Sequence, residues 1–268
     1  MTVLQGVRRW VRQHERLRRL AGKLVGRASQ LRARGLTVRE RWTRAIPYES
    51  TFWEDWLATR AFGNEDEYRA RLDPRLPVTE RFLAELVVAT HEQELSILDV
   101  GAGPLTTVGR TYGSKRLTIV AIDPLAEEYD RILESSGVVP PVRTRPGEGE
   151  RLLELFPAGS FDIAYSANAL DHSYDPLLVI RNMVNVVKPG GYVLLRHRRN
   201  EAEAKDYLGL HQWNFDIQDG RFVVWNREGA HDIAHALGSI AEVTAFAEDS
   251  EVCCVLRREA ATSRSDRS

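Results

Sequence analysis

Short apolar segments alternate with segments of helical periodicity from residue 95 onward, and this alternation constrains the fold more than any other feature of the chain. Such alternation is typical of a parallel sheet with crossover helices. We therefore predict a doubly wound α/β domain. Its strands are expected at Leu95–Val100, Leu117–Ile122, Val142–Arg145, Phe161–Tyr165 and Tyr192–Arg196, with helices at Leu125–Ser135 and Leu177–Val187.

The last two apolar segments are arranged differently. Ala241–Phe246 and Val252–Arg257 are separated by only five residues, a spacing that predicts an antiparallel hairpin. We therefore expect a seven-stranded, mostly parallel sheet with an antiparallel last strand. The adjacent Cys253 and Cys254 would point to opposite faces of that strand, so they are expected to pack in a core rather than to form a disulfide.

The first 44 residues are strongly basic. They carry thirteen Lys/Arg and two Asp/Glu, so their net charge is about +11, against about −12 for the remainder. Apolar residues recur there at seven-residue spacing, which predicts a helical arm over residues 1–46. Three uses stay open for this arm: a solvated extension, docking on an acidic surface or on the second subunit of a homodimer, and contact with an anionic membrane surface or nucleic acid.

Aromatic side chains are dense between residues 47 and 90, after a break expected at Pro47. We predict short helices at Ser50–Thr59, Glu65–Arg71 and Thr79–Ala89 that pack on the main domain as a cap or lid. The predicted organisation is a basic arm (1–46), this cap segment (47–90), the α/β domain (91–259) and a disordered tail (260–268).

No long apolar run occurs in the sequence. A transmembrane helix would need about 18 or more consecutive apolar residues, so none is expected. Arginines interrupt every apolar stretch near the N-terminus, which argues against a secretory signal. We therefore expect a cytoplasmic protein.

A glycine-containing turn, Gly101-Ala102-Gly103, follows the first predicted strand. Glycines let the backbone pass close to a ligand, and a helix beginning after them would offer free N–H groups. About twenty residues further on, Asp123 ends the second strand, where an acidic side chain can accept hydrogen bonds from both hydroxyls of a ribose. This pattern predicts a nucleotide-binding site.

Four segments of the chain form an ordered set of motifs: Leu98–Gly103, Asp123, Phe161–His172 and the turn Val187-Lys188-Pro189-Gly190-Gly191. Together they resemble the ordered motifs of class I methyltransferases, which use S-adenosylmethionine. They cover roughly residues 90–200, and the reversed last strand fits the same family. A nicotinamide-binding domain would instead need a third glycine near residue 106, where this chain has Pro104, Leu105 and Thr106.

The resemblance implies roles for residues around the glycine turn. Gly101, Ala102 and Gly103 would line the methionine portion of the cofactor. Asp99 would orient the amino group of that portion, directly or through water. A structural role, in which Asp99 caps nearby backbone, stays open.

The same resemblance implies a second group of contacts. Asp123 would bind the ribose with Leu125 beside the adenine, and Asn168 would lie next to the cofactor. Glu148, where the family usually has Asp, would accept a hydrogen bond from the adenine amino group, with Glu150 as a competitor. A helix N-terminal acid is the structural alternative for Glu148.

Candidate catalytic residues follow the fourth and fifth strands. Methyl transfer needs an aligned nucleophile and, for a neutral amine or alcohol, a base with a pKa near neutrality. His172 and His211 are the candidate bases, beside Asp171. The alternative for His172 is packing near the cofactor without a part in the chemistry. The alternative for His211 is a place in a structured loop whose side chains bond to the loop's own backbone. Asp175 and Asp216 could join them around a divalent metal, but the spacing does not require one and no metal is predicted.

The acceptor is expected to be a small molecule with an oxygen or nitrogen nucleophile. The cap segment and the insertion after the fifth strand favour an enclosed pocket. Similar layouts occur among methyltransferases of sugars or amino sugars in natural-product or surface-polysaccharide pathways, whereas the acidic domain argues against nucleic acid. Two other classes stay open: a nicotinamide-dependent oxidoreductase, which would bind NADH, and a non-catalytic scaffold tethered by its arm, which would bind no cofactor.

Overall fold

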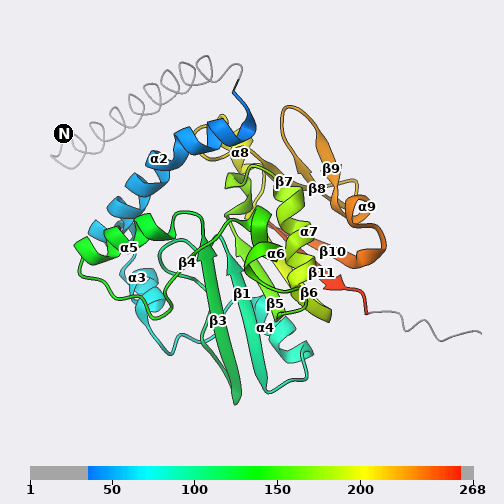
Figure 1. The fold of residues 1–268 in the computed structure, drawn as a ribbon, viewed down its shortest axis with the longest axis horizontal. Helices are drawn as coiled ribbons and strands as arrows, with labels where there is room; N and C mark the ends of the chain where they lie inside the picture. The colour runs from blue at the N-terminus through cyan, green and yellow to red at the C-terminus, as the bar shows by residue number, and fades with distance from the viewer. Residues whose placement is uncertain (1–35, 261–268) are drawn as a thin grey trace, which may run out of the picture.

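The computed structural model describes residues 36–260 (Figure 1), and its main body is an eight-stranded, mostly parallel sheet. The strands are β1 (Glu94–Val100), β2 (Thr111–Tyr112), β3 (Lys115–Asp123), β4 (Arg145–Pro146), β5 (Phe161–Ala167), β6 (Val187–Arg198), β10 (Ala241–Glu248) and β11 (Glu251–Arg258). Their order is β10-β11-β6-β5-β1-β3-β2, with β4 also paired to β3. The last strand, β11, runs antiparallel to β6 and β10, which confirms the predicted reversal.

The sheet has one strand more than the seven predicted. The extra strand is β2, which pairs antiparallel with the start of β3 at the sheet edge. The strand expected at Val142–Arg145 is reduced to the two residues of β4. Pro140, Pro141 and Pro146 lack the N–H donors that a longer ladder would need.

Helices cover both faces of the sheet, so the domain is doubly wound as predicted. On one face packs α4 (Arg81–Ala89), and on the other pack α6 (Leu152–Leu155) and α7 (Pro176–Val186). The two cysteines follow the expected alternation, because Cys253 belongs to the core beneath α4 and Cys254 to the core beneath α7. Both thiols are free.

One long helix, α2 (Val38–Ala58), takes the place of the short helix expected after Pro47. It begins with a capping box between Thr37 and Glu40 and continues through Pro47, so the predicted break is wrong and α2 crosses the expected boundary between residues 46 and 47. A proline inside a helix costs about 3 kcal/mol, which burial of the C-terminal half of α2 offsets at about 1.5–3 kcal/mol per large apolar side chain. The buried side chains of this half are Trp53, Trp56 and Leu57, which pack with residues of α5 (Ala126–Ser135).

The glycine turn after β1 is not followed by the expected helix. Residues 101–110 form a loop that leads to β2. The segment that follows α3 (Glu65–Leu72) docks on this loop, and the Val78 N–H donates to the Thr111 carbonyl at 3.0 Å. Gly109 lies so close to this segment that a Cβ there would be 2.3 Å from the Val78 nitrogen. This docking holds the loop in an extended path.

A second, three-stranded antiparallel sheet was not predicted. It consists of β7 (Asn214–Gln218), β8 (Arg221–Trp225) and β9 (Ala230–Asp232), and it lies between α8 (Glu201–Ala204) and α9 (Ile233–Leu237) in the chain. Asp219-Gly220 between two apolar segments is the hairpin signal that marks β7 and β8. The side chains of this sheet that enter the main core are Phe215, Phe222 and Val224.

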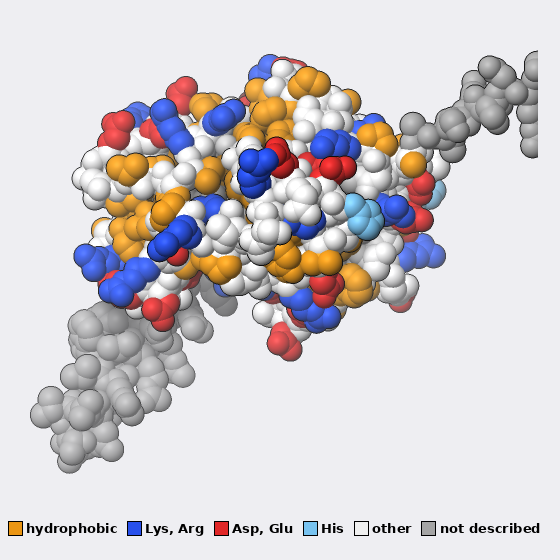
Figure 2. Space-filling view, turned by 90° about the horizontal axis from the view of Figure 1, so that it is seen from below, with side chains coloured by type: hydrophobic (Ala, Val, Ile, Leu, Met, Phe, Trp, Pro, Cys, Tyr) orange, Lys and Arg blue, Asp and Glu red, His pale blue; other side chains and the backbone are white. Residues whose placement is uncertain are grey.

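Lys/Arg and Asp/Glu side chains are interspersed on the face of the molecule shown in Figure 2. Within residues 36–260, no helix is both long and apolar enough to cross a membrane. Most of the basic arm, up to residue 35, and the tail from residue 261 lie outside the described residues. The docking predictions for the arm and the disorder predicted for the tail therefore stay predictions.

Candidate active site

A cavity of about 670 Å³ opens at the carboxyl ends of β1, β3, β5 and β6, and residues of α2 form one of its walls. Ligands of doubly wound sheets bind at this edge. The structure brings together the predicted cofactor-binding residues and the candidate catalytic residues, because all of them line this cavity. They are Asp99, Gly101, Ala102, Gly103, Asp123, Leu125, Glu148, Asn168, Asp171, His172 and His211.

Two glycines shape the turn after β1. Gly101 has a φ of +75° and Gly103 a φ of +63°, in the left-handed region that favours glycine. A Cβ on Gly101 would lie 2.4 Å from the Cβ of Ala169, and a Cβ on Gly103 would lie 2.8 Å from the Trp53 ring. Neither position has space for a side chain, so the backbone itself forms this part of the cavity surface.

Asp123 is buried at the end of β3 and is held by two backbone donors. The Gly103 N–H donates to Oδ2 at 3.1 Å and the Leu125 N–H donates to Oδ1 at 2.9 Å. Burial raises the pKa of Asp123 to about 7, although both hydrogen bonds favour the ionised form. The carboxyl group is therefore fixed in orientation and changes its charge near neutral pH.

Asp99 is buried at the end of β1 and bonds to the loop that follows. Its carboxylate accepts a hydrogen bond from the Thr106 hydroxyl at 2.5 Å, which ties the end of β1 to the loop after the glycine turn. Burial raises the pKa of Asp99 to about 6. The bond to Thr106 gives Asp99 a structural partner, although the donor is a side-chain hydroxyl and not the backbone that a cap would bind. Asp99 also lies on the cavity wall, and its contact with the cofactor stays a prediction.

Glu148 and Glu150 have different partners. Glu150 accepts hydrogen bonds from the backbone N–H groups of Tyr174 and Asp175, at 2.9 and 3.1 Å, and so fixes the turn before α7. Glu148 accepts from the Tyr174 hydroxyl at 2.8 Å and from Arg39 at 3.3 Å, and it makes no side-chain cap on the short helix that follows. Among residues 36–260, the partners of the Glu148 carboxylate are thus side chains.

Asn168 connects two strand ends. Its Oδ1 accepts from the Arg198 N–H at 2.8 Å, and its own N–H donates to the Arg196 carbonyl at 2.9 Å. Its φ of +48° places it in the left-handed region, which Asn tolerates better than most residues. These bonds hold the turn that carries the next group of residues.

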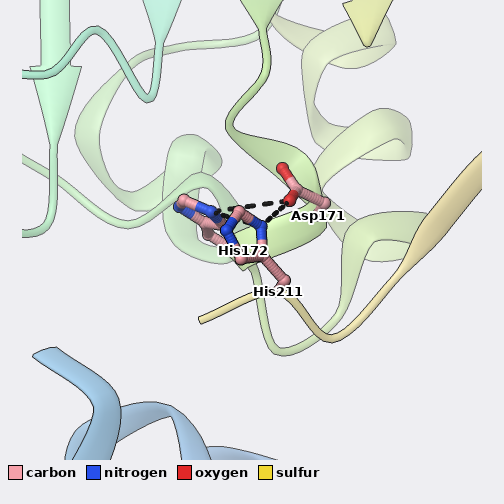
Figure 3. Close-up of side chains that lie close together, drawn as sticks. All are labelled: Asp171, His172 and His211. Carbon is pink, nitrogen blue, oxygen red and sulfur yellow. Dashed lines mark hydrogen bonds and ion pairs between the residues drawn. The ribbon is translucent and has the colours of Figure 1, made fainter. Parts of the chain in front are cut away.

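Asp171, His172 and His211 converge in the cavity (Figure 3). Asp171 and His172 come from the turn after β5, and His211 comes from the loop before β7. Nδ1 of His211 lies 2.7 Å from Oδ2 of Asp171. Nε2 of His172 lies 3.1 Å from Nδ1 of His211 and 3.4 Å from Oδ2 of Asp171.

Asp171 remains ionised although it is buried. Burial raises its pKa, but the neighbouring His172 and His211 more than offset that effect and hold the pKa at about 2. A carboxylate beside two imidazoles can hold protons on the imidazole nitrogens or can bind a divalent cation together with them.

The two other carboxylates considered as metal ligands lie elsewhere. Asp175 caps α7 by accepting from the Leu178 N–H at 3.0 Å. Asp216 forms an ion pair with Arg199 at 2.7 Å. Neither residue lines the cavity.

The sequence did not point to Glu49 or Trp53, which line the cavity from α2. Oε2 of Glu49 lies 3.8 Å from Nδ1 of His172, and Oε1 of Glu49 accepts from the Trp53 Nε1–H at 2.8 Å. The helix predicted to begin at Ser50 left Glu49 outside it, whereas α2 carries both residues one turn apart to the cavity.

The sequence also missed His197, which is buried at the end of β6 and lines the cavity. Its ring stacks on Phe215 with the centroids 4.2 Å apart, and neither ring nitrogen has a hydrogen-bond partner among the described residues. Burial lowers the pKa of His197 to about 4, so the ring is neutral at pH 7. Because His197 directly follows the strand expected at Tyr192–Arg196, the rule that ligands bind at carboxyl strand ends could have identified it.

Residues 98–195 match the model of a protein family described as a methyltransferase domain. A ubiquinone biosynthesis O-methyltransferase of Pseudomonas aeruginosa (strain LESB58) is 28% identical over 199 residues, which cover 68% of this chain and 82% of the relative. The protein of the same description from Pseudomonas fluorescens (strain SBW25) is 27% identical over the same shares.

Solved structures with a similar chain path include the trans-methyltransferase CalH in complex with S-adenosylhomocysteine. It is 14% identical, with 66% of this chain and 54% of that chain covered and a TM-score of 0.47. An O-methyltransferase family protein from Burkholderia thailandensis is also 14% identical, with 75% and 60% covered and a TM-score of 0.42.

The matched segment runs from β1 to β6 and includes the glycine turn and Asp123. Together with the reversed last strand, these features agree with the resemblance to class I methyltransferases drawn from the sequence. The chain is an S-adenosylmethionine-dependent methyltransferase, and S-adenosylmethionine is its cofactor.

Proposed function

We propose that this enzyme transfers the methyl group of S-adenosylmethionine to an oxygen or nitrogen nucleophile of a small molecule. One observation carries the proposal: a single cavity holds both the glycine turn with Asp123 and the group Asp171, His172 and His211. Its volume of about 670 Å³ lies within the range of small-molecule sites, about 300–1,000 Å³.

The cofactor is proposed to lie across the carboxyl ends of β1 and β3. The glycine turn lines the cavity where the methionine portion would lie, and the buried carboxyl of Asp123 would bind the ribose. Glu148 is favoured over Glu150 for the adenine amino group, because Glu150 is engaged by two backbone N–H groups. The remaining contacts are assigned to Asp99, Ala102, Leu125 and Asn168.

The acceptor is proposed to bind against Asp171, His172 and His211. In the transfer, a lone pair of the nucleophile forms a bond to the methyl carbon. The carbon–sulfur bond breaks, its electron pair stays on sulfur, and S-adenosylhomocysteine leaves. A neutral hydroxyl or amine must also lose a proton. In the simplest form of the reaction, His172 or His211 accepts this proton, and the ionised Asp171 stabilises the resulting imidazolium.

A hydroxyl-rich acceptor, such as a sugar or amino sugar, fits the wall beyond this group. Arg198 and Lys205 line the cavity there and share the carboxylate of Glu201, at 3.9 and 3.6 Å. Such side chains provide donors and acceptors for several hydroxyl groups. The Pseudomonas relatives are named O-methyltransferases, which favours oxygen as the nucleophile.

The test is methyl transfer to a panel of sugars, amino sugars and aromatic hydroxyl compounds, with S-adenosylhomocysteine and the methylated product measured by mass spectrometry. His211→Ala and Asp171→Asn are expected to lower kcat by about 100-fold or more, as loss of acid–base assistance does. Their affinity for S-adenosylhomocysteine should change less than about threefold, a small energy on the scale of a lost hydrogen bond. His235→Ala, on the distant α9, serves as the control. Wild-type turnover in both site variants would contradict the proposed role of the group.

A further inference from the structure

We propose that Asp171, His172 and His211 form a binding site for a divalent transition-metal cation that holds the acceptor's nucleophile. This inference rests on the proposed function and specifies how the group activates the acceptor. The cation, rather than a free imidazole, would loosen the acceptor's proton.

The three ligand atoms have the spacing of a metal triad. Three ligands at right angles, each about 2.1 Å from a metal, lie about 3.0 Å from one another. Oδ2 of Asp171, Nε2 of His172 and Nδ1 of His211 are separated by 2.7, 3.1 and 3.4 Å. The measured separations lie on both sides of the ideal value, so one ion can reach all three atoms with small side-chain adjustments.

The kinds of ligand restrict the kinds of metal. Two imidazoles and one carboxylate suit the divalent ions of manganese, iron, cobalt, nickel and zinc, whereas magnesium and calcium prefer oxygen ligands alone. Three protein ligands also leave coordination positions free for an acceptor or water, as in catalytic rather than structural metal sites.

Other residues lie next to the three ligands and orient them. Metal-bound histidines usually direct their second ring nitrogen at a carboxylate or carbonyl group. Nδ1 of His172 faces Oε2 of Glu49 at 3.8 Å, and Glu49 is itself held by Trp53. On the other side, the Asp171 carbonyl accepts from the Gln212 N–H at 2.8 Å, which couples the Asp171 turn to the loop of His211.

The charge of the cavity favours a cation. Among its lining residues, eight carry carboxyl groups and three are Arg or Lys. A cation coordinated to an acceptor hydroxyl withdraws electron density from the oxygen and lowers the pKa of that hydroxyl. The proton then passes to water, the oxygen attacks the methyl carbon, and the electron pair of the broken carbon–sulfur bond remains on sulfur.

Titration with cobalt(II) tests the site without relying on activity. The full-length protein is dialysed against EDTA, returned to chelator-free buffer and titrated with Co²⁺ while its visible absorption is recorded. We expect saturation at one ion per chain in the wild type and in the His235→Ala control. Asp171→Asn and His211→Gln should bind Co²⁺ at least tenfold more weakly, while calorimetry shows unchanged affinity for S-adenosylhomocysteine and so confirms that they fold.

Absence of stoichiometric Co²⁺ binding in the wild type, or wild-type binding in both variants, would overturn the proposal. Methyl transfer that persists undiminished in EDTA would also overturn it, while leaving the proposed function intact. Co²⁺ binding that is lost in the variants would support the site even if no acceptor of the panel were methylated, and that result would count against the proposed function alone.

Discussion

Replacement of Asp123 by Asn should make the stability of the protein less dependent on pH. The unfolded carboxyl has a pKa of about 3.9, whereas burial raises the pKa of the folded Asp123 to about 7. The folded state therefore holds this proton more tightly, and the wild type loses stability as pH rises from about 4 to 7. With these values, Asp123 alone lowers the free energy of unfolding by about 2–3 kcal/mol between pH 5 and pH 8.

The Asn amide cannot ionise, but it cannot accept hydrogen bonds from both Gly103 and Leu125. That loss should cost about 1–3 kcal/mol at every pH. Urea unfolding of the cofactor-free wild type and Asp123→Asn at pH 5 and pH 8 separates the two effects, because only the ionisation changes with pH. We expect the variant to gain about 2–3 kcal/mol relative to the wild type between the two pH values. A difference that is the same at both pH values would refute the assignment of a raised pKa to Asp123.

Three further outcomes are expected. Gly103→Ala should weaken S-adenosylhomocysteine binding and lower the free energy of unfolding by about 1–3 kcal/mol, because the new Cβ would meet the Trp53 ring at a positive φ. Unchanged affinity in calorimetry and unchanged unfolding in urea would contradict this. His197→Leu should leave the free energy of unfolding unchanged or raise it by about 1 kcal/mol, because two buried ring nitrogens without hydrogen-bond partners among the described residues are removed. A large destabilisation in urea unfolding at pH 7 would contradict this. Burial raises the pKa of Cys253 to about 11 and also raises the pKa of Cys254. Both thiols should therefore resist a thiol reagent at pH 8 until the protein is unfolded. Rapid labelling of the native protein would contradict this and would show that strand β11 opens.

The main sheet could be predicted from the sequence because its strands are buried on both faces and appear as continuous apolar segments. The turn at Gly101-Ala102-Gly103 and the position of Asp123 could be predicted for a related reason, since both stand at carboxyl ends of such strands. The closeness of Asp171 and His211 could not be predicted in this way. It depends on the loop before β7, which the Gln212 N–H ties to the Asp171 carbonyl, and no local pattern records that contact.

The errors arose where tertiary packing outweighs local preference. Pro47 usually interrupts a helix, but burial of Trp53 and Trp56 keeps α2 continuous. A helix usually follows a nucleotide-binding glycine turn, but the docking of Val78 and its neighbours on residues 101–110 leaves an extended loop. The α5 residues that bury the two tryptophans, and the Val78 segment that docks on the loop, each lie more than twenty residues away in the sequence from the element they stabilise. Single-sequence reasoning could not weigh such distant contacts.

Calorimetric titration of the purified protein with S-adenosylmethionine and S-adenosylhomocysteine tests the central assignment most directly. We expect both compounds to bind to the wild type, and Asp123→Ala to bind about 1–3 kcal/mol more weakly because charge-assisted hydrogen bonds to the ribose are lost. NADH should give no response. Absence of binding to either compound, or unchanged affinity in a folded Asp123→Ala variant, would contradict the cofactor site described for this cavity.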